Sequence, residues 1–307
     1  MTATTLTRPA ETTPARQSHH PGAVGLVLAG ALSVHSGSAV AASLFPRAGV
    51  WVVVAMRLTV GAILLLAICR PKIRGRSRAD WALVAAFGAA LAGMNTLFYL
   101  AIERIPLGTA VTLEVLGPLT LSVIAARRAS AWLWAGLALA GVALLGRGGF
   151  DRLDPLGVAL TLMAGALWAS YIVLSSRTGS RFPKADGLAL AMGVAAVLTL
   201  PLGVAGAGPA LLDPAVLGLG AAVAMLSSVL PYTLEMFALR KLHTSTFAIL
   251  MSLGPAIAGC AGVVILGQVM TWADALATAL VIAASIGAVR SGSARRGPAE
   301  SPGPLPA

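Results

Sequence analysis

The sequence predicts an all-α membrane protein with ten transmembrane helices. Of its 307 residues, 57% are hydrophobic and only 11% are charged, whereas a soluble globular domain carries about 25% charged residues. Apolar runs of about twenty residues recur along the chain, and each is long enough to cross the hydrocarbon core of a bilayer as a helix. The apolar character within each run is continuous, which does not fit the alternating strands of a membrane β-barrel.

Ten such runs follow one another between short polar segments. In chain order, the predicted spans are 22–45, 49–69, 81–102, 107–126 and 131–146, and then 156–176, 187–207, 215–239, 246–266 and 272–289. Five of the six tryptophans lie near the predicted start of a span, where indole rings prefer the membrane interface. Residues 1–21 and 290–307 are polar and rich in Pro, Ser, Thr or Gly, so we predict two disordered cytoplasmic tails.

The positive charge predicts how the chain is oriented. The sequence has 22 Lys and Arg against 11 Asp and Glu, a formal net charge of +11, which in a soluble protein would suggest a nucleic-acid partner. With the N-terminus in the cytoplasm, seventeen of these cations fall inside and only Arg47, Arg104, Arg147 and Arg152 fall outside, with Arg57 left within a span. This asymmetry fits the positive-inside rule. We therefore predict that both termini are cytoplasmic and that no nucleic acid is bound.

Short matches between the two halves predict an internal repeat. Ala29-Gly30-Ala31-Leu32 recurs as Ala164-Gly165-Ala166-Leu167, and Leu116-Gly117-Pro118 recurs as Leu253-Gly254-Pro255, at nearly the same offset. The halves are 22–146 and 155–289. Because each contains an odd number of helices, the second half enters the membrane from the opposite side. Secondary transporters have this inverted-repeat plan, with the substrate site near the midplane between the halves.

Two charged residues lie near the centres of predicted spans. Arg57 costs about 2.5–3.5 kcal/mol there on insertion scales, so it must face an interior. Its planar guanidinium suits a substrate carboxylate; a structural ion pair or a side chain that snorkels to the surface are the alternatives. Glu114 precedes Pro118 by four residues, so the proline frees the backbone carbonyl of Glu114 beside its carboxylate. This pair of acceptors suits an ammonium group or a proton, and the alternative is a hydrogen bond between helices.

The eighth and ninth spans contain related features. Glu235 follows Pro231 by four residues, with Tyr232 between them, and either assists the site or pairs with Arg240 or Lys241 at the surface. Pro255 breaks the ninth span without a carboxylate, because Met251 stands at the place that corresponds to Glu114. We therefore expect the first half to carry more of the substrate or coupling role. The predicted helix breaks are Pro118, Pro231 and Pro255.

Polar aromatic pairs mark the third and sixth spans. Asn95 and Tyr99 are one turn apart, as are Trp168 and Tyr171, and both pairs suit either a wet cavity wall or contacts between helices. His35 lies among serines of the first span and is predicted to hydrogen-bond between helices, with a proton relay as the alternative. The two cysteines, Cys69 and Cys260, predict no disulfide framework and no metal cluster. No cofactor is expected.

Two stretches of the chain carry the resemblance to a known family. The first is Gly93-Met94-Asn95-Thr96-Leu97-Phe98-Tyr99-Leu100 through Pro106-Leu107-Gly108, with Leu113-Glu114 and Gly117-Pro118; the second is Leu230-Pro231-Tyr232-Thr233-Leu234-Glu235-Met236, with Leu250-Met251-Ser252 and Gly254-Pro255. With these motifs the chain resembles the threonine/homoserine exporters of the RhtA type, in the EamA branch of the drug/metabolite transporter superfamily. The resemblance covers about Gly22 to Val289.

The resemblance implies an inner-membrane carrier built of two EamA repeats. It further implies export of small amino acids such as threonine and homoserine, driven by the proton gradient. The alternatives are export of another metabolite, drug or amino-acid analogue by the same fold, and, in a different class, a membrane receptor that does not transport. An intramembrane hydrolase with Ser36 or Ser38 and His35 is disfavoured, because neighbours on one helix cannot easily form the geometry of a nucleophile and its base. We therefore predict a transporter and not an enzyme.

Overall fold

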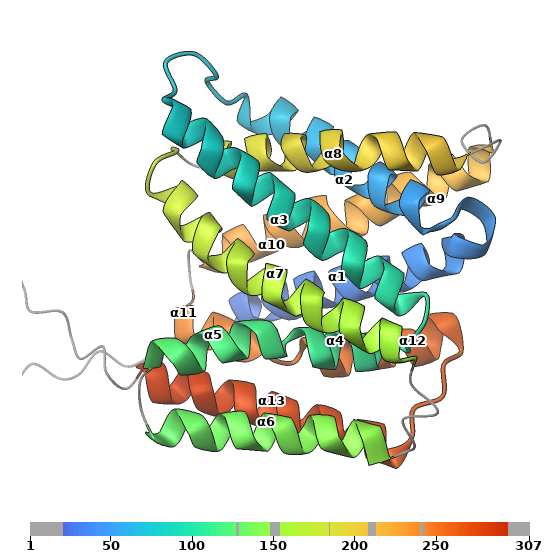
Figure 1. Ribbon diagram of the computed structural model, residues 1–307, viewed down its shortest axis with the longest axis vertical. Coiled ribbons are helices and arrows are strands. Elements are labelled where there is room, and N and C mark those ends of the chain that lie inside the picture. The colour runs from blue at the N-terminus through green and yellow to red at the C-terminus, as the bar shows by residue number, and fades with distance from the viewer. Residues whose placement is uncertain are drawn as a thin grey trace, which may run out of the picture.

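The described part of the chain is built entirely from helices. The structure, a computed structural model, describes residues 21–126, 129–147, 154–183, 185–207, 213–239, 242 and 244–293. Within these ranges every regular element is helical and no strand is found, which confirms the all-α class (Figure 1). The predicted tails lie largely outside the described residues, except that Pro21 begins α1 and residues 290–293 continue α13.

The helices follow the predicted spans closely, but two spans are divided. The first half contains α1 (Pro21–Ala48), α2 (Val50–Cys69), α3 (Arg78–Ile102), α4 (Leu107–Glu114), α5 (Leu116–Ala126) and α6 (Ala129–Arg147). The second half contains α7 (Pro155–Gly179), α8 (Asp186–Ala207), α9 (Pro214–Ala224), the π-helical η3 (Met225–Val229), α10 (Leu230–Leu239), α11 (Thr244–Met251), α12 (Gly254–Leu266) and α13 (Trp272–Ser293). The pair α4–α5 and the pair α11–α12 each make up one predicted span.

Eight helical segments of the described chain are long and apolar enough to cross a membrane. The apolar stretches Trp132–Leu145 and Pro214–Val229 are shorter than these eight; they correspond to the predicted fifth and eighth spans. Large apolar side chains such as Leu139, Val197 and Val264 lie exposed on the outer faces of the bundle. A lipid environment explains these faces, because a soluble protein rarely exposes large contiguous apolar patches. The protein is thus a multi-pass membrane protein.

Helices from the two halves of the sequence pack against each other throughout the bundle. The contacts pair α2 with α8, α3 with α7, α6 with α13, α4 with α12, and α1 with both α10 and α12. Figure 1 shows α2 and α8 at one end of the molecule, α6 and α13 at the other, and α1 between them. The halves are therefore interleaved along the whole molecule, so that the space between them is enclosed by both.

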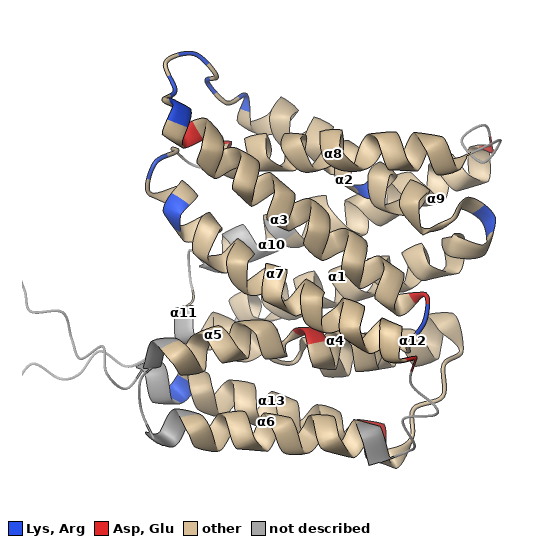
Figure 2. Ribbon diagram, viewed as in Figure 1, with Lys and Arg blue, Asp and Glu red and all other residues tan. Residues whose placement is uncertain are grey.

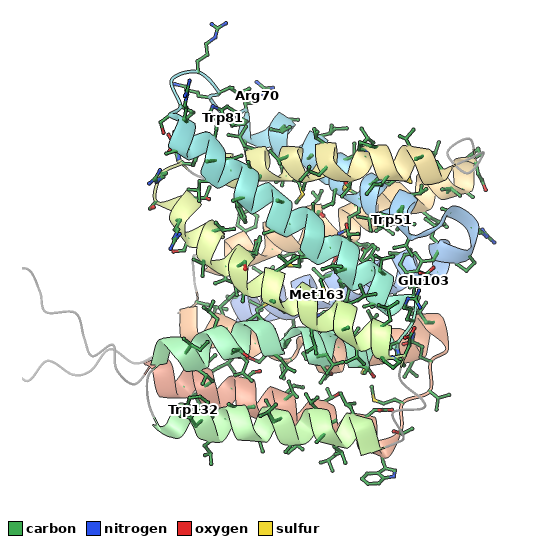
Figure 3. The ribbon with its side chains drawn as sticks, viewed as in Figure 1. Trp51, Arg70, Trp81, Glu103, Trp132 and Met163 are labelled. Carbon is green, nitrogen blue, oxygen red and sulfur yellow. The ribbon has the colours of Figure 1, made fainter. Side chains whose placement is uncertain are left out.

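The charged side chains gather at the two edges of the bundle where helices begin and end (Figure 2). The segment between α2 and α3 carries Arg70, Lys72, Arg74 and Arg76, whereas Arg47 and Arg104 lie at the opposite edge. Arg104 donates to Asp154 at 2.9 Å, and this hydrogen bond holds the pKa of the Asp154 carboxyl below its usual value. Trp81 and Glu103 mark the two ends of α3 (Figure 3). The interior between the edges is almost free of charge.

One crossing brings backbone against backbone in the middle of the bundle. A Cβ added at Gly165 of α7 would lie 2.6 Å from the carbonyl oxygen of Glu114, and one added at Gly117 of α5 would overlap the backbone of Gly165. Only glycine allows this approach at both positions, since small residues let membrane helices come closest together. The crossing fixes α7 against the break between α4 and α5.

We predict that Gly165→Ala destabilises the protein. The added methyl group forces the two helices apart, and overpacking of this kind costs about 1–3 kcal/mol. The measurement is the Tm of the detergent-solubilised protein. Gly136→Ala in α6 is the matched control, because nothing lies within 4 Å of its added Cβ and alanine favours a helix by about 0.8–1.0 kcal/mol over glycine. Equal Tm values for the two variants would contradict the close crossing.

Candidate functional site

A cavity of about 190 Å³ lies where the two halves meet. Its walls come from α1, α2, α3, α4, α7, η3, the start of α10 and the junction of α11 with α12. Six of the residues singled out from the sequence line it: Arg57, Asn95, Glu114, Trp168, Tyr171 and Pro231. Tyr99 and Pro255 lie next to lining residues in the chain, and Pro118 lies three residues after the lining Val115, but none of the three is itself part of the wall. The side chains of Tyr232 and Glu235, both on α10, lie outside the described residues.

Glu114 occupies a break in the fourth span. The α-helix ends at Glu114 and resumes at Leu116, because Pro118 has no N–H to donate to the Glu114 carbonyl. That carbonyl oxygen faces Gly165 of α7. That this carbonyl stands beside the carboxylate as a second acceptor for the substrate stays a prediction; the close helix crossing brings Gly165 against it.

The carboxylate of Glu114 is the group that this residue offers to the cavity. Glu114 is 9% exposed and lines the cavity. Among the described residues, none forms a hydrogen bond with its side chain and no cation lies within ion-pair distance. A buried carboxylate without a partner is costly, so this position favours a ligand that brings a hydrogen-bond donor or a positive charge.

Arg57 is held by two neutral groups on different helices. Its Nη1 donates to the Tyr99 hydroxyl at 2.7 Å, and its Nη2 donates to the carbonyl of Ser227 at 3.3 Å. The guanidinium carbon also lies 5.2 Å from the centre of the Tyr99 ring. Its Nε is buried and has no hydrogen-bond partner among the described residues. The side chain is fixed in place, yet none of these partners neutralises its charge.

The position of Pro231 in the sequence explains why the carbonyl of Ser227 is available to Arg57. Pro231 stands four residues after Ser227, so it cannot donate the helical hydrogen bond to this carbonyl. The helix responds locally: η3 adopts π-helical geometry before α10 begins at Leu230, and such insertions are frequent at functional sites. Ser227 was not among the residues predicted for the site. The proline rule that identified Glu114 would have found it if applied to Pro231.

The members of the two polar aromatic pairs differ in whether they line the cavity. Asn95 lines the cavity and donates its side-chain N–H to the carbonyl of Leu91 at 2.8 Å, so its amide oxygen is left for the cavity. Trp168 and Tyr171 of α7 line the opposite wall, and the Tyr171 ring packs 5.2 Å from that of Phe87. Tyr99 is fully buried and lies behind Arg57. Tyr99 therefore supports the guanidinium of Arg57 and does not line the cavity.

His35 also lines the cavity, although the sequence argument left it out of the site. Its Nδ1 is buried without a partner among the described residues, and its Nε2 approaches Gly254 of α12. The hydroxyl of Ser38 donates to the carbonyl of Val34 at 3.1 Å. Ser38, one of the two serines considered for a hydrolase, is thus bonded to backbone and not to His35. This geometry disfavours the hydrolase.

The described residues contain no group of three or more His, Cys, Asp or Glu side chains that could hold a metal ion. The cavity is instead a small, mainly apolar space with one half-buried cation, Arg57 of α2, and one buried carboxylate, Glu114 of α4. The two charges do not approach within ion-pair distance. Each is therefore open to the opposite charge of a small zwitterionic ligand.

Comparisons with known proteins place the chain in a family. A model of the EamA-like transporter family matches residues 155–290. The threonine/homoserine exporter RhtA of Salmonella typhimurium strain SL1344 is 42% identical over 257 residues, which cover 83% of this chain and 87% of the relative. The protein of the same name from Escherichia coli K12 is 40% identical over 264 residues, 85% of this chain and 89% of the relative. The chain belongs to the RhtA family.

Membership of the RhtA family confirms the resemblance on which the sequence argument relied. RhtA proteins are exporters within the EamA-like transporters, so this chain is a transporter and not an enzyme. A solved structure titled "Crystal structure of protein" superposes with a TM-score of 0.60 at 22% identity and covers 89% of this chain and 98% of its own. That likeness supports the helical fold and nothing more specific.

Proposed function

We propose that the protein is a secondary transporter of the inner membrane that exports L-threonine and L-homoserine, by exchange for protons. The observation that carries the proposal is the identity of 40–42% with two threonine/homoserine exporters over more than four fifths of the chain. The chemistry of the central cavity supports it independently, because the cavity offers one cation and one carboxylate to a ligand.

The size of the cavity favours a small amino acid. Pockets for drug-sized ligands are about 300–1,000 Å³, whereas this cavity is about 190 Å³. Arg57 would bind the substrate carboxylate through its guanidinium, and Glu114 would meet the ammonium group. Asn95 offers an amide oxygen to a hydroxyl or ammonium, and Trp168 and Tyr171 provide an aromatic wall. Glu235 and Tyr232 would assist from α10.

Proton exchange follows from the position of Glu114. A buried carboxylate next to a mobile cationic ligand is charged when the ligand is bound and gains a proton when the ligand leaves. One acidic group can therefore bind substrate and proton in turn, so that each is displaced on the side where the other is abundant.

The alternating path of the chain supports the proposed topology. In Figure 1 successive helical segments run back and forth between the two edges, and α1 begins and α13 ends at the same edge. We propose ten crossings, including the two shorter apolar stretches, with both termini cytoplasmic at the edge that holds Arg70 to Arg76. The halves, 22–146 and 155–289, would form two inverted EamA repeats that rock against each other. Both are interrupted at corresponding places, at Val115 and at Ser252-Leu253.

We predict that Glu114→Gln abolishes coupled export. The amide cannot carry a proton or a negative charge, and loss of a charge-assisted contact of about 1.5–3 kcal/mol lowers threonine efflux from preloaded cells at least about tenfold. The pH dependence of the remaining flux is expected to vanish. Asp213→Asn is the matched control. Asp213 is an exposed helix cap that accepts from the N–H of Ala215 and does not line the cavity, and asparagine caps equally well. Efflux at the unaltered level with unaltered pH dependence would remove Glu114 from the coupling role.

We predict that Arg57→Lys raises the apparent KM for threonine about tenfold or more, because a single ammonium cannot hold Tyr99 and Ser227 and also bind a carboxylate in two places. The measurement is the concentration dependence of threonine uptake into proteoliposomes. Arg74→Lys in the exposed segment between α2 and α3 is the control and leaves KM unchanged. Competition by homoserine, but not by lysine or by dyes, distinguishes the proposed substrates from other metabolites and drugs. An unchanged KM in Arg57→Lys contradicts the carboxylate clamp.

A further inference from the structure

A second hollow of about 340 Å³ lies toward the edge that carries Arg47 and Glu103. We call it the outer vestibule, and its lining residues are Ala42, Phe45, Pro46, Ile102, Glu103, Leu266 and Gln268. Figure 3 shows Glu103 at this end of α3. The vestibule continues the central cavity along two helices. On α1 the cavity wall ends at Ser38 and the vestibule wall begins at Ala42; on α3 the corresponding residues are Phe98 and Ile102.

Three aromatic rings separate the two spaces. Phe98 lines the cavity, Phe45 lines the vestibule, and Tyr99 contacts both, with ring centres 6.1 Å from Phe98 and 5.7 Å from Phe45. Tyr99 is the largest fully buried side chain of the described chain. On the facing helix, Ala39 and Ala41 are also fully buried. These three rings, which we call the aromatic barrier, form an unbroken series of contacts from the cavity wall at Phe98 to the vestibule wall at Phe45.

Tyr99 connects this barrier to the residue that meets the substrate. Its hydroxyl accepts the 2.7 Å hydrogen bond from Nη1 of Arg57. A hydrogen bond from a charged donor is about twice as strong as one between neutral groups. In the empty cavity the guanidinium therefore holds the central ring of the barrier in place. A carboxylate that binds Arg57 competes with the Tyr99 hydroxyl for the same N–H groups.

We propose that Tyr99 is the positioning residue through which occupancy of the cavity controls the aromatic barrier. The inference rests on the proposed function, since it takes the substrate to be a carboxylate that binds Arg57. With the cavity empty, the bond from Arg57 keeps Tyr99 between Phe45 and Phe98, and the passage is closed. A substrate carboxylate draws Nη1 away, Tyr99 loses its anchor, and the passage to the vestibule opens. A ligand shifts a conformational equilibrium only through such a difference in contacts between two states.

The test measures access from the vestibule to the cavity. A reporter cysteine replaces Val34, which lines the cavity, in a chain whose Cys69 and Cys260 are changed to alanine. A membrane-impermeant thiol reagent is added to intact cells, and the rate of labelling is measured with and without threonine. With Tyr99 present, we expect slow labelling that threonine accelerates by about fivefold, the effect of releasing one hydrogen bond.

Tyr99→Phe keeps the ring and removes only the hydroxyl. We expect the Tyr99→Phe chain to label about fivefold faster without threonine, to show no further acceleration with threonine, and to bind threonine with a lowered KM, because the carboxylate no longer has to displace the Tyr99 hydroxyl from Arg57. Thr112→Val is the control: it also removes a buried hydroxyl, bonded to Gly108 and Thr278 outside the cavity. Its labelling is expected to match that of the unaltered reporter chain.

Equal labelling rates for Tyr99→Phe and the reporter chain without threonine would overturn the proposal. Phe45→Ala, which thins the barrier from the vestibule side without touching Arg57, guards against a folding defect in Tyr99→Phe: it should label fast while KM for threonine stays unchanged. Slow labelling of Phe45→Ala would also overturn the barrier. A third outcome separates this proposal from the proposed substrate. If Tyr99→Phe labels fast without threonine, but threonine does not accelerate labelling of the reporter chain, the barrier role of Tyr99 is supported. The same result contradicts threonine as the substrate.

Discussion

A backbone carbonyl that loses its helical donor inside a bilayer has no water to replace it. Pro118, Pro231 and Pro255 each remove such a donor, and the carbonyls left behind belong to the residues four positions earlier: Glu114, Ser227 and Met251. All three of these residues line the central cavity. The helix breaks at these three prolines therefore surround one space, which both halves enclose.

The ways in which these carbonyls are satisfied determine the character of the cavity. Gly165 of α7 approaches the oxygen of Glu114, which ties the second half to the first and leaves the carboxylate for the cavity. Arg57 donates to the oxygen of Ser227, which holds a cation at the cavity without neutralising it. A buried charge whose immediate partners are all neutral remains attractive to an anion. The contacts that these backbone carbonyls make therefore also leave one cation and one carboxylate available to a zwitterion.

Most of the fold could be predicted from the sequence, because length and hydropathy define a membrane helix almost completely. The predicted span 81–102 is α3 (Arg78–Ile102), and α8 matches the predicted span 187–207 within one residue at its start. The site was harder to predict. Helical spacing places Asn95 and Tyr99 on one face, but it does not say that one lines the cavity while the other supports Arg57 from behind. His35 was left out because its surroundings come from distant helices, about which a single sequence carries little information. Ser227 could have been found, because it stands four residues before Pro231.

The crossing of Gly117 with Gly165 also limits how the two halves can move. No side chain lies between the two backbones there, so α7 has little freedom to slide along α5 and relative motion is left mainly as rotation about the contact. The crossing then acts as a fulcrum. Displacement grows with distance from a fulcrum, so Glu114, beside it, shifts least, while the distant ends of α7 sweep the widest arcs. A small change of angle at this crossing therefore becomes a large displacement at the far ends of α7.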